Sequence, residues 1–295
     1  MNWFWFALIA LICWSGSDLF SKIGCCGEKD KTAHLKMVVA VGLVMGLHAA
    51  YMIVFHHVSV TWDVVWTYLP VSLLYILSMT LGYVGLRYIE LSISSPICNS
   101  SGALVAVLCL CTGALSDYNG PQKAVILCAV GLVCLGVVGL GVVEAREDDD
   151  LRRRRQEHAN RKYAKSWLAI CLPVAYCLLD AAGTFADSLV LETLDEDAAN
   201  AAYELTFLFA AVCCFVYVKF IKKDKFIPKM EAPKYIGAAF ETAGQFAYIY
   251  AIGDQAHVAL AAPIISAYCV ASVVWSRIFL KEKLSWKHYA MITLV

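Results

Sequence analysis

Ten apolar stretches follow one another along this chain of 295 residues, and they constrain its fold more than any other feature. A membrane-spanning helix needs about 20 mostly apolar residues to cross a hydrocarbon core roughly 30 Å thick. Lipid offers no water to unpaired backbone groups, so each crossing segment should be helical. The ten candidates are residues 3–20, 37–55, 68–86, 91–115, 121–143, 167–191, 201–218, 235–252, 258–280 and 284–295. We expect the last of these helices to be truncated, since it holds only about a dozen residues, or roughly 18 Å of helix.

The composition excludes a soluble domain. Apolar residues make up 60% of the chain, charged residues only 16%, and the mean hydropathy is +0.65. A soluble fold of this composition would expose more apolar surface than water tolerates. The sequence therefore predicts an all-α polytopic membrane protein with ten transmembrane helices.

The basic residues predict the orientation. Of the 24 Lys and Arg residues, 23 lie in alternate loops or at the adjoining helix ends, and Lys123 is the exception. Lys and Arg in short loops are retained on the cytoplasmic side. We therefore expect a multi-pass protein of the cell membrane with an extracytoplasmic N-terminus. On this topology five acids remain inside the apolar stretches: Asp18, Asp180, Asp187, Glu204 and Glu241.

The longest polar loop divides the chain into two halves of five helices. We expect a first repeat at residues 1–144, a charged cytoplasmic linker at 145–166 and a second repeat at 167–295. An odd number of helices per half places the second half in the opposite orientation, as in many secondary transporters. The first stretch of each half has an aromatic residue four positions before an Asp, Trp14 before Asp18 and Tyr176 before Asp180. The basic block at 152–155 can serve as a solvated tether or contact anionic lipid headgroups.

One motif resembles a known family. Residues 277–285, Arg-Ile-Phe-Leu-Lys-Glu-Lys-Leu-Ser, precede an apolar stretch and resemble the loop that ends the penultimate helix of EamA-type transporters in the drug/metabolite transporter (DMT) superfamily. The ten helices, the two halves and the aromatic first segment are also similar to that family. The first half has Gly-Ala-Leu-Ser-Asp at 113–117 where a second copy would recur. The resemblance implies alternating access around a central cavity lined by the first, third, fourth, sixth, eighth and ninth helices.

Two acids within the apolar stretches are candidates for this cavity. An ionisable group inside a membrane is costly unless it is paired or hydrated, so it marks a functional site by default. Asp180 has no basic residue within reach on its own helix. Glu241, Gln245 and Tyr248 follow each other at i, i+4 and i+7, which forms one polar stripe on a helix. A structural hydrogen bond to a neighbouring helix is the alternative for both acids.

The remaining intramembrane ionisable groups are open to two interpretations each. Asp18 lies four residues before Lys22, so it can form a structural ion pair or face the cavity. Asp187 and Glu204 lie near outer helix ends, where we expect hydrated, interfacial acids; a functional role within the membrane is the alternative. His48 is either a packed, hydrogen-bonded side chain or a proton relay.

Uncharged candidates come from two proline-marked segments and from buried aromatic residues. A proline inside a helix removes one backbone hydrogen bond and frees a carbonyl group. Deep aromatic side chains suit organic substrates, and cations in particular. The predicted substrate-binding residues of these two kinds are Asn99 and Ser101 after Pro96, Ser266 and Tyr268 after Pro263, and the aromatic residues Trp14, Tyr83, Tyr176 and Tyr248.

The resemblance implies a secondary transporter, an exporter. Five acids and almost no bases lie in the predicted spans, which predicts a small cationic, zwitterionic or neutral organic metabolite as its substrate. Proton coupling would use Asp180, Glu241 or Asp18. The alternative is a membrane-embedded enzyme acting on a lipid-like substrate, but His56 and His57 lack an acid partner beyond Asp63. We expect no enzymatic activity, no cofactor and no metal. The expected partners are a small-molecule substrate and membrane lipids, not nucleic acid, with the chain a monomer or homodimer.

Overall fold

The protein is a bundle of helices in the computed structural model, which describes residues 3–26, 30–112, 119–147, 154, 167–191, 193–252, 264–265 and 267–295. Helices hold 85% of these residues, and no strand occurs among them. The predicted all-α class is confirmed. The helices are α1 (Trp3–Cys25), α2 (Ala33–Phe55), α3 (Trp62–Gly85), α4 (Leu91–Asn99), α5 (Ser101–Thr112), α6 (Gly120–Arg146), η1 (Trp167–Ile170), α8 (Cys171–Val190), α9 (Glu196–Val216), η2 (Tyr217–Ile221), α10 (Pro228–Ile252), α12 (Tyr268–Trp275), η3 (Ser276–Leu280) and α13 (Trp286–Ile292).

Six helical segments in the described ranges are long and apolar enough to cross a membrane. They are Trp3–Cys25, Ala33–Phe55, Trp62–Gly85, Leu91–Leu108, Gly120–Arg146 and Glu196–Ile221. The long helices α8 and α10 do not reach this hydropathy, and they carry the intramembrane acids Asp180, Asp187 and Glu241. Six crossings support a multi-span membrane protein, and the ten-crossing arrangement stays a prediction.

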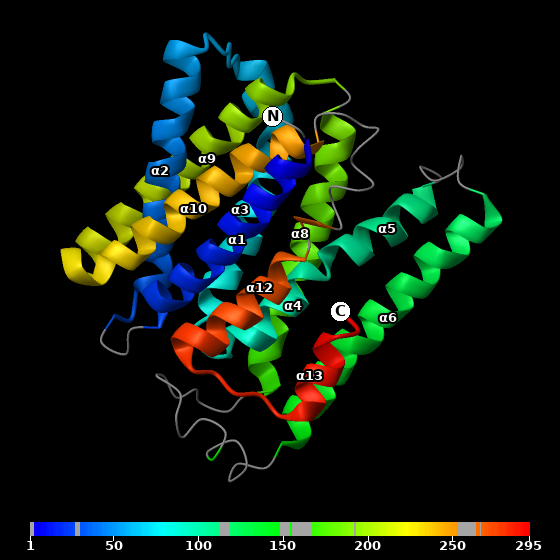
Figure 1. The fold of residues 1–295 in the computed structure, drawn as a ribbon. Coiled ribbons are helices and arrows are strands. Elements are labelled where there is room, and N and C mark those ends of the chain that lie inside the picture. Colours follow the sequence, from blue (N-terminus) through cyan, green and yellow to red (C-terminus); the bar gives the residue numbers. More distant parts are fainter. Residues whose placement is uncertain are drawn as a thin grey trace.

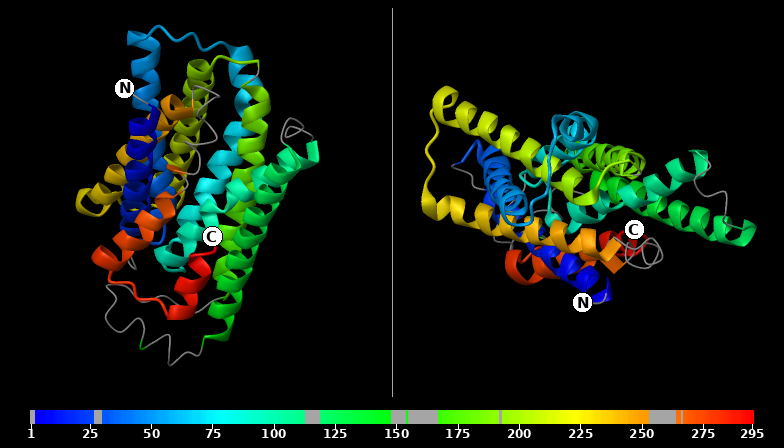
Figure 2. Two further views of the ribbon diagram at one scale, coloured as in Figure 1. Left: turned by 45° about the vertical axis from the view of Figure 1, so that its right-hand side comes forward. Right: turned by 90° about the horizontal axis from the view of Figure 1, so that it is seen from above.

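Helices of the first half pack mainly on helices of the second. α1 lies along α10, α2 along α9 and α3 along α8 (Figure 1). α6 lies at the edge of the bundle with α13 against it, which both views of Figure 2 show. Only 17% of the most apolar window of α6 is buried, so this helix is peripheral.

A close approach of α2 and α9 forms the centre of the main core. Gly42 and Gly46 are four residues apart, a spacing of small residues that lets membrane helices come together. A Cβ built on Gly42 would lie 2.5 Å from the carbonyl oxygen of Phe207, a fully buried residue of α9. Only glycine at position 42 therefore permits this contact.

The predicted fourth span is interrupted. Residues 91–112 form α4 and α5 with a turn at Ser100, four residues after Pro96. Glu282, the acid of the 277–285 motif, accepts hydrogen bonds from the backbone amides of Leu91 at 3.2 Å and Ser92 at 3.1 Å. Helix N-terminal amides need such acceptors. The motif thus connects the end of η3 in the second half to the start of α4 in the first.

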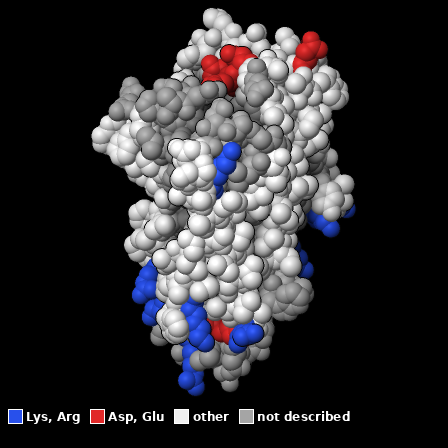
Figure 3. Space-filling model, turned by 90° about the vertical axis from the view of Figure 1, so that its right-hand side faces the viewer, with Lys and Arg blue, Asp and Glu red and all other residues white. Residues whose placement is uncertain are grey.

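Three lysines that we assigned to cytoplasmic loops and helix ends are buried within helices. α1, α2 and α10 extend beyond the predicted spans and include Lys22, Lys36 and Lys234, whose exposed fractions are 0%, 3% and 1%. Carbonyl and carboxylate partners compensate for their burial, as described below. On the face shown in Figure 3, acidic side chains gather at one end of the molecule, and basic side chains lie mainly toward the other.

Candidate substrate cavity

A cavity of about 440 Å³ lies between helices of the two halves. Small-molecule sites in proteins occupy roughly 300–1,000 Å³. Side chains of α1, α3, α4, α5, α8, α10 and α12 line the cavity, and Tyr203 of α9 joins them. These are the spans that the family resemblance assigned to a central cavity, with α9 in addition.

The structure brings together almost all of the predicted binding residues. Ser266 lies outside the described residues. The other ten line this one cavity, together with Asp18. The ten are Trp14, Tyr83, Asn99, Ser101, Tyr176, Asp180, Glu241, Gln245, Tyr248 and Tyr268. Their role in binding a substrate stays a prediction.

Asp18 faces the cavity rather than forming an ion pair with Lys22. Its carboxylate accepts hydrogen bonds from Ser95 Oγ at 2.5 Å and Ser272 Oγ at 2.7 Å. The two serines belong to α4 and α12, which come from different halves of the chain. Asp18 therefore connects α1 to α4 of the first half and to α12 of the second through neutral hydroxyl groups.

Lys22 hydrogen-bonds to the turn that follows α3. Its Nζ donates to the carbonyl oxygen of Leu86 at 2.6 Å and to that of Ile89. Carbonyl groups at the end of a helix have no partner within it. The lysine satisfies them, which explains why it points away from Asp18.

Asp180 and Glu241 also have hydroxyl partners. Ser101 hydrogen-bonds to Asp180, and Ser17 hydrogen-bonds to Glu241. Glu241 interacts electrostatically with both Asp18 and Asp180. Each acid thus makes the interhelical hydrogen bond that was the alternative interpretation, and it lines the cavity as well.

Asp187 lies in the cavity and not at the hydrated interface, so our prediction for it is wrong. Tyr68 donates to its Oδ1 at 2.6 Å, and Tyr75 donates to its Oδ2 at 3.4 Å. Our sequence analysis did not select these two tyrosines. One signal was present, because Tyr68 and Tyr75 are seven residues apart, as are Asp180 and Asp187, and this spacing places each pair on one helix face.

Glu204 is likewise buried, contrary to our prediction of an interfacial acid. Its side chain is 1% exposed and accepts a hydrogen bond from Nδ1 of His48 at 2.8 Å. Neither of these described side chains lines the cavity. The contact supports the packed, hydrogen-bonded interpretation of His48, and it joins α2 to α9.

Aromatic rings form a large part of the cavity wall. The ring of Trp14 lies 5.2 Å from that of Tyr248 and 5.7 Å from that of Tyr268, measured between centroids. A Cβ on Gly244 would lie 2.5 Å from Trp14 Cδ1, so this glycine makes room for the indole. Faces of such rings attract cations.

Three buried polar atoms of the cavity wall have no hydrogen-bond partner among the described residues: Trp14 Nε1, Tyr83 Oη and Ser21 Oγ. Buried polar groups in proteins are normally paired. An indole N–H can only donate, whereas hydroxyl groups donate or accept. The cavity therefore offers one donor at the indole and two hydroxyl groups that can accept hydrogen bonds from an occupant or donate to it.

At one end of the bundle, buried lysines and acids form an ion network. Lys36 Nζ lies 3.1 Å from Asp30, and Lys234 Nζ lies 3.3 Å from the other oxygen of Asp30 and 2.9 Å from Glu231. Asp30 is only 2% exposed. Breaking a buried ion pair leaves an uncompensated charge, so this network holds α2, α10 and the segment before α2 together.

The network continues into the loop after η2. Lys36 Nζ lies 3.5 Å from Asp224 and donates to the carbonyl oxygen of Lys225 at 2.8 Å. The hydroxyl of Thr32 donates to Asp224 at 2.6 Å and lowers the pKa of that carboxyl group. The loop between η2 and α10 is thereby fixed to the start of α2.

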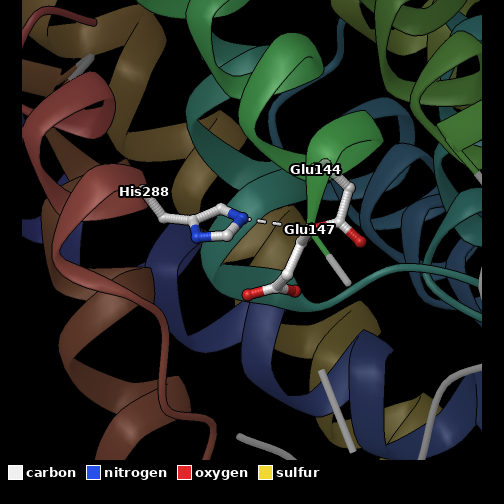
Figure 4. Close-up of side chains that lie close together, drawn as sticks. All are labelled: Glu144, Glu147 and His288. Carbon is white, nitrogen blue, oxygen red and sulfur yellow. Dashed lines mark hydrogen bonds and ion pairs between the residues drawn. The ribbon is translucent and has the colours of Figure 1, made fainter. Parts of the chain in front are cut away.

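Glu144, Glu147 and His288 form a cluster whose side-chain ligand atoms lie within 4.8 Å of one another. Figure 4 shows the His288 ring directed at Glu144, with Nε2 at 3.1 Å from its carboxylate. Nδ1 of the same ring lies 2.7 Å from Ser285 Oγ. The fully buried imidazole is thus hydrogen-bonded on both sides, which accounts for its orientation and fixes α13 to the C-terminus of α6.

The bundle and its acidic, aromatic cavity are features of a helical membrane transporter. Residues 167–295 match the sequence model of the EamA-like transporter family. This match, to a family of the DMT superfamily, confirms the resemblance drawn from the 277–285 motif. No curated protein matches the chain.

Proposed function

We propose that the protein carries small organic cations, or zwitterions and neutral solutes with a basic group, by alternating access. The observation that carries this proposal is the charge of the cavity. Asp18, Asp180, Asp187 and Glu241 line it, and no Lys or Arg is found among its described lining residues. An organic anion would be repelled by these carboxylates in a medium of low dielectric constant. A cationic group would be attracted to them and to the aromatic wall.

The pattern of helix contacts supports two inverted repeats. If an approximate two-fold axis exchanges the halves, α1 corresponds to α8 and α3 to α10, so the contact of α1 with α10 should recur as α8 with α3. Both contacts are present. The contact of α2 with α10 should likewise recur as α9 with α3, and it does. Repeats of this kind suit rocking of one half against the other around a central site.

The charge distribution supports the proposed orientation in the cell membrane. The ion network of Asp30, Lys36, Glu231 and Lys234 and the cluster around His288 belong to the end that carries most of the bases. By the positive-inside rule this end is cytoplasmic, and the N-terminus is then extracytoplasmic. A closed ion network at this end would favour a cavity reached from the opposite side.

Proton exchange is proposed for Asp180, Glu241 or Asp18. A buried carboxylate is costly as an uncompensated anion. Its hydroxyl partners carry no charge, so a proton and a substrate cation would compete for the same carboxylate. Competition of this kind couples proton entry to export of the cation.

Transport into proteoliposomes tests the proposal. We expect uptake of labelled primary amines and amino acids, weak or no uptake of organic anions, and acceleration by an imposed proton gradient. Asp180→Asn and Glu241→Gln should reduce transport at least tenfold. Asp63→Asn, which changes an exposed acid of α3, is the matched control and should retain transport. Preference for organic anions would refute the charge argument, and indifference to the gradient would refute the coupling.

A further inference from the structure

The acids of the cavity are not clustered at one point. Asp180 and Asp187 both lie on the uninterrupted helix α8, seven residues apart. Seven residues are close to two full turns, so both side chains project from the same face, and their positions differ by roughly 10 Å along the axis at 1.5 Å per residue. The cavity therefore presents negative charge at two levels.

The first level is a group of three acids. Glu241 interacts electrostatically with Asp18 and Asp180. Ser17, the neighbour of Asp18 on α1, hydrogen-bonds to Glu241. Tyr83 contributes an unpartnered hydroxyl to the same cavity and also interacts with Glu241. A protonated amine at this level would find carboxylate acceptors from α1, α8 and α10.

The second level is Asp187 with its two tyrosines. Tyr68 and Tyr75 of α3 donate to the two carboxylate oxygens, so neutral hydroxyl groups stabilise the negative charge of Asp187. Carboxylate oxygens accept more than one hydrogen bond each. Asp187 therefore keeps the capacity to accept hydrogen bonds from a second cationic group.

The wall between the two levels is aromatic and uncharged. Tyr75 interacts electrostatically with both Asp187 and Asp180 and hydrogen-bonds to Thr184, which lies one turn from each acid. Such a wall suits the methylene chain that separates two amines.

From this spacing we propose that the preferred substrate is an elongated organic dication, a linear diamine or polyamine with amines roughly 10 Å apart. This inference rests on the proposed transport of cations and narrows its substrate class. A monocation can compensate one level and leaves the other uncompensated. A dication of matching length compensates both.

Binding of a homologous series to the purified full-length protein tests the inference. The probes are α,ω-diaminoalkanes of increasing length and n-alkylamines of equal carbon number, and the readouts are calorimetric affinity and thermal stabilisation. We expect diamines to bind roughly 10- to 100-fold more tightly than matched monoamines, the gain typical of one added charge-assisted hydrogen bond. The optimum should fall where the nitrogens are roughly 8–12 Å apart.

Variants test whether Asp187 causes the tighter binding of diamines. In Asp187→Asn the ratio of diamine to monoamine affinity should fall toward one, and in the control Asp63→Asn the ratio should stay at its wild-type value. If the wild-type protein binds monoamines as tightly as diamines, or shows no dependence on length, the dication inference is wrong while cation transport stands. If it binds neither amine class but does bind organic anions, the proposed function fails as well. The wild-type series decides the question even if Asp187→Asn does not fold.

Discussion

Adding one methyl group at the contact of α2 with α9 should destabilise the protein measurably. A Cβ on Gly42 would lie 2.5 Å from Ala211 Cβ and 2.5 Å from the Phe207 carbonyl oxygen. Carbon atoms in contact prefer about 3.5–4.0 Å, and a backbone carbonyl cannot rotate away as a side chain can. In Gly42→Ala the two helices must therefore separate locally.

The expected cost follows from two opposing terms. Overpacking a close-packed core costs about 1–3 kcal/mol, and alanine regains up to about 1 kcal/mol over glycine in helix propensity. The net destabilisation is then roughly 1–2 kcal/mol, which lowers Tm by about 2–8 °C for a chain of this size. Thermal unfolding in detergent, followed by tryptophan fluorescence, measures it.

Two further glycines provide a graded control. A Cβ on Gly46 would lie 2.8 Å from the end of the Leu208 side chain, which can change rotamer, so Gly46→Ala should cost less than Gly42→Ala. Gly131 of α6 has no atom of the described residues within 4 Å of a built Cβ, so Gly131→Ala should leave Tm unchanged or slightly higher. If Gly131→Ala destabilises as much as Gly42→Ala, or if the order of the three is reversed, the packing argument is refuted.

Three other predictions concern the polar contacts outside the cavity. Glu204→Gln and His48→Ala should each lower stability by about 1–3 kcal/mol, and the double variant should cost less than their sum, as a double-mutant cycle of Tm values can show. Lys36→Met should leave Asp30 with Lys234 still paired to it, at a cost of at most about 3–5 kcal/mol. The loosened network should accelerate thiol labelling of Cys25, which is fully buried in α1 and interacts electrostatically with Lys234, as mass spectrometry can measure; unchanged labelling would contradict the closed network. His288→Ala should weaken the contact of α13 with α6 and cost about 1–3 kcal/mol, visible as faster proteolysis of the C-terminal segment; equal proteolysis would contradict this role of His288.

The helices could be predicted because lipid restricts what an apolar segment can do, but the helix ends that carry lysines could not. Lys22, Lys36 and Lys234 are charged, and sequence patterns assign charged residues near a helix end to water. In the structure these lysines are buried because Asp30, Glu231 and several backbone carbonyls compensate them. Those partners come from distant parts of the chain, and only the folded structure brings them together.

Glycine patterns show the same limit. The fifth span has glycines at 131, 136, 139 and 141, which we would assign to helix packing. Gly136 and Gly139 do lie against α13, where a built Cβ would come within 2.6 Å and 2.1 Å of a neighbouring atom. A Cβ built on Gly131 or Gly141 has no atom within 4 Å in the part of the chain that the structure describes. Sequence identifies small residues, but it does not reveal which face has a neighbouring helix.

The cavity residues were more predictable than the helix ends, for a physical reason. A polar side chain in a membrane helix must face protein or water, so Asp180, Glu241 and Gln245 could only point inward. The partners were harder to identify: Tyr68 and Tyr75 are amphipathic, and tyrosine near a helix end is equally consistent with the membrane interface. Asp187 was misassigned by the same positional argument.

The residues that form the cavity also weaken the membrane signal of the helices that carry them. α8 holds Asp180 and Asp187, α10 holds Glu241 and Gln245, and both fall short of the hydropathy of the six apolar spans although they are long enough. α6, which contributes no described residue to the cavity, has the highest hydropathy of the six, at 2.8. In this fold, low hydropathy of a long helix thus accompanies a position along the cavity. A long helix of low hydropathy between two apolar spans is therefore better interpreted as a cavity helix than as a loop.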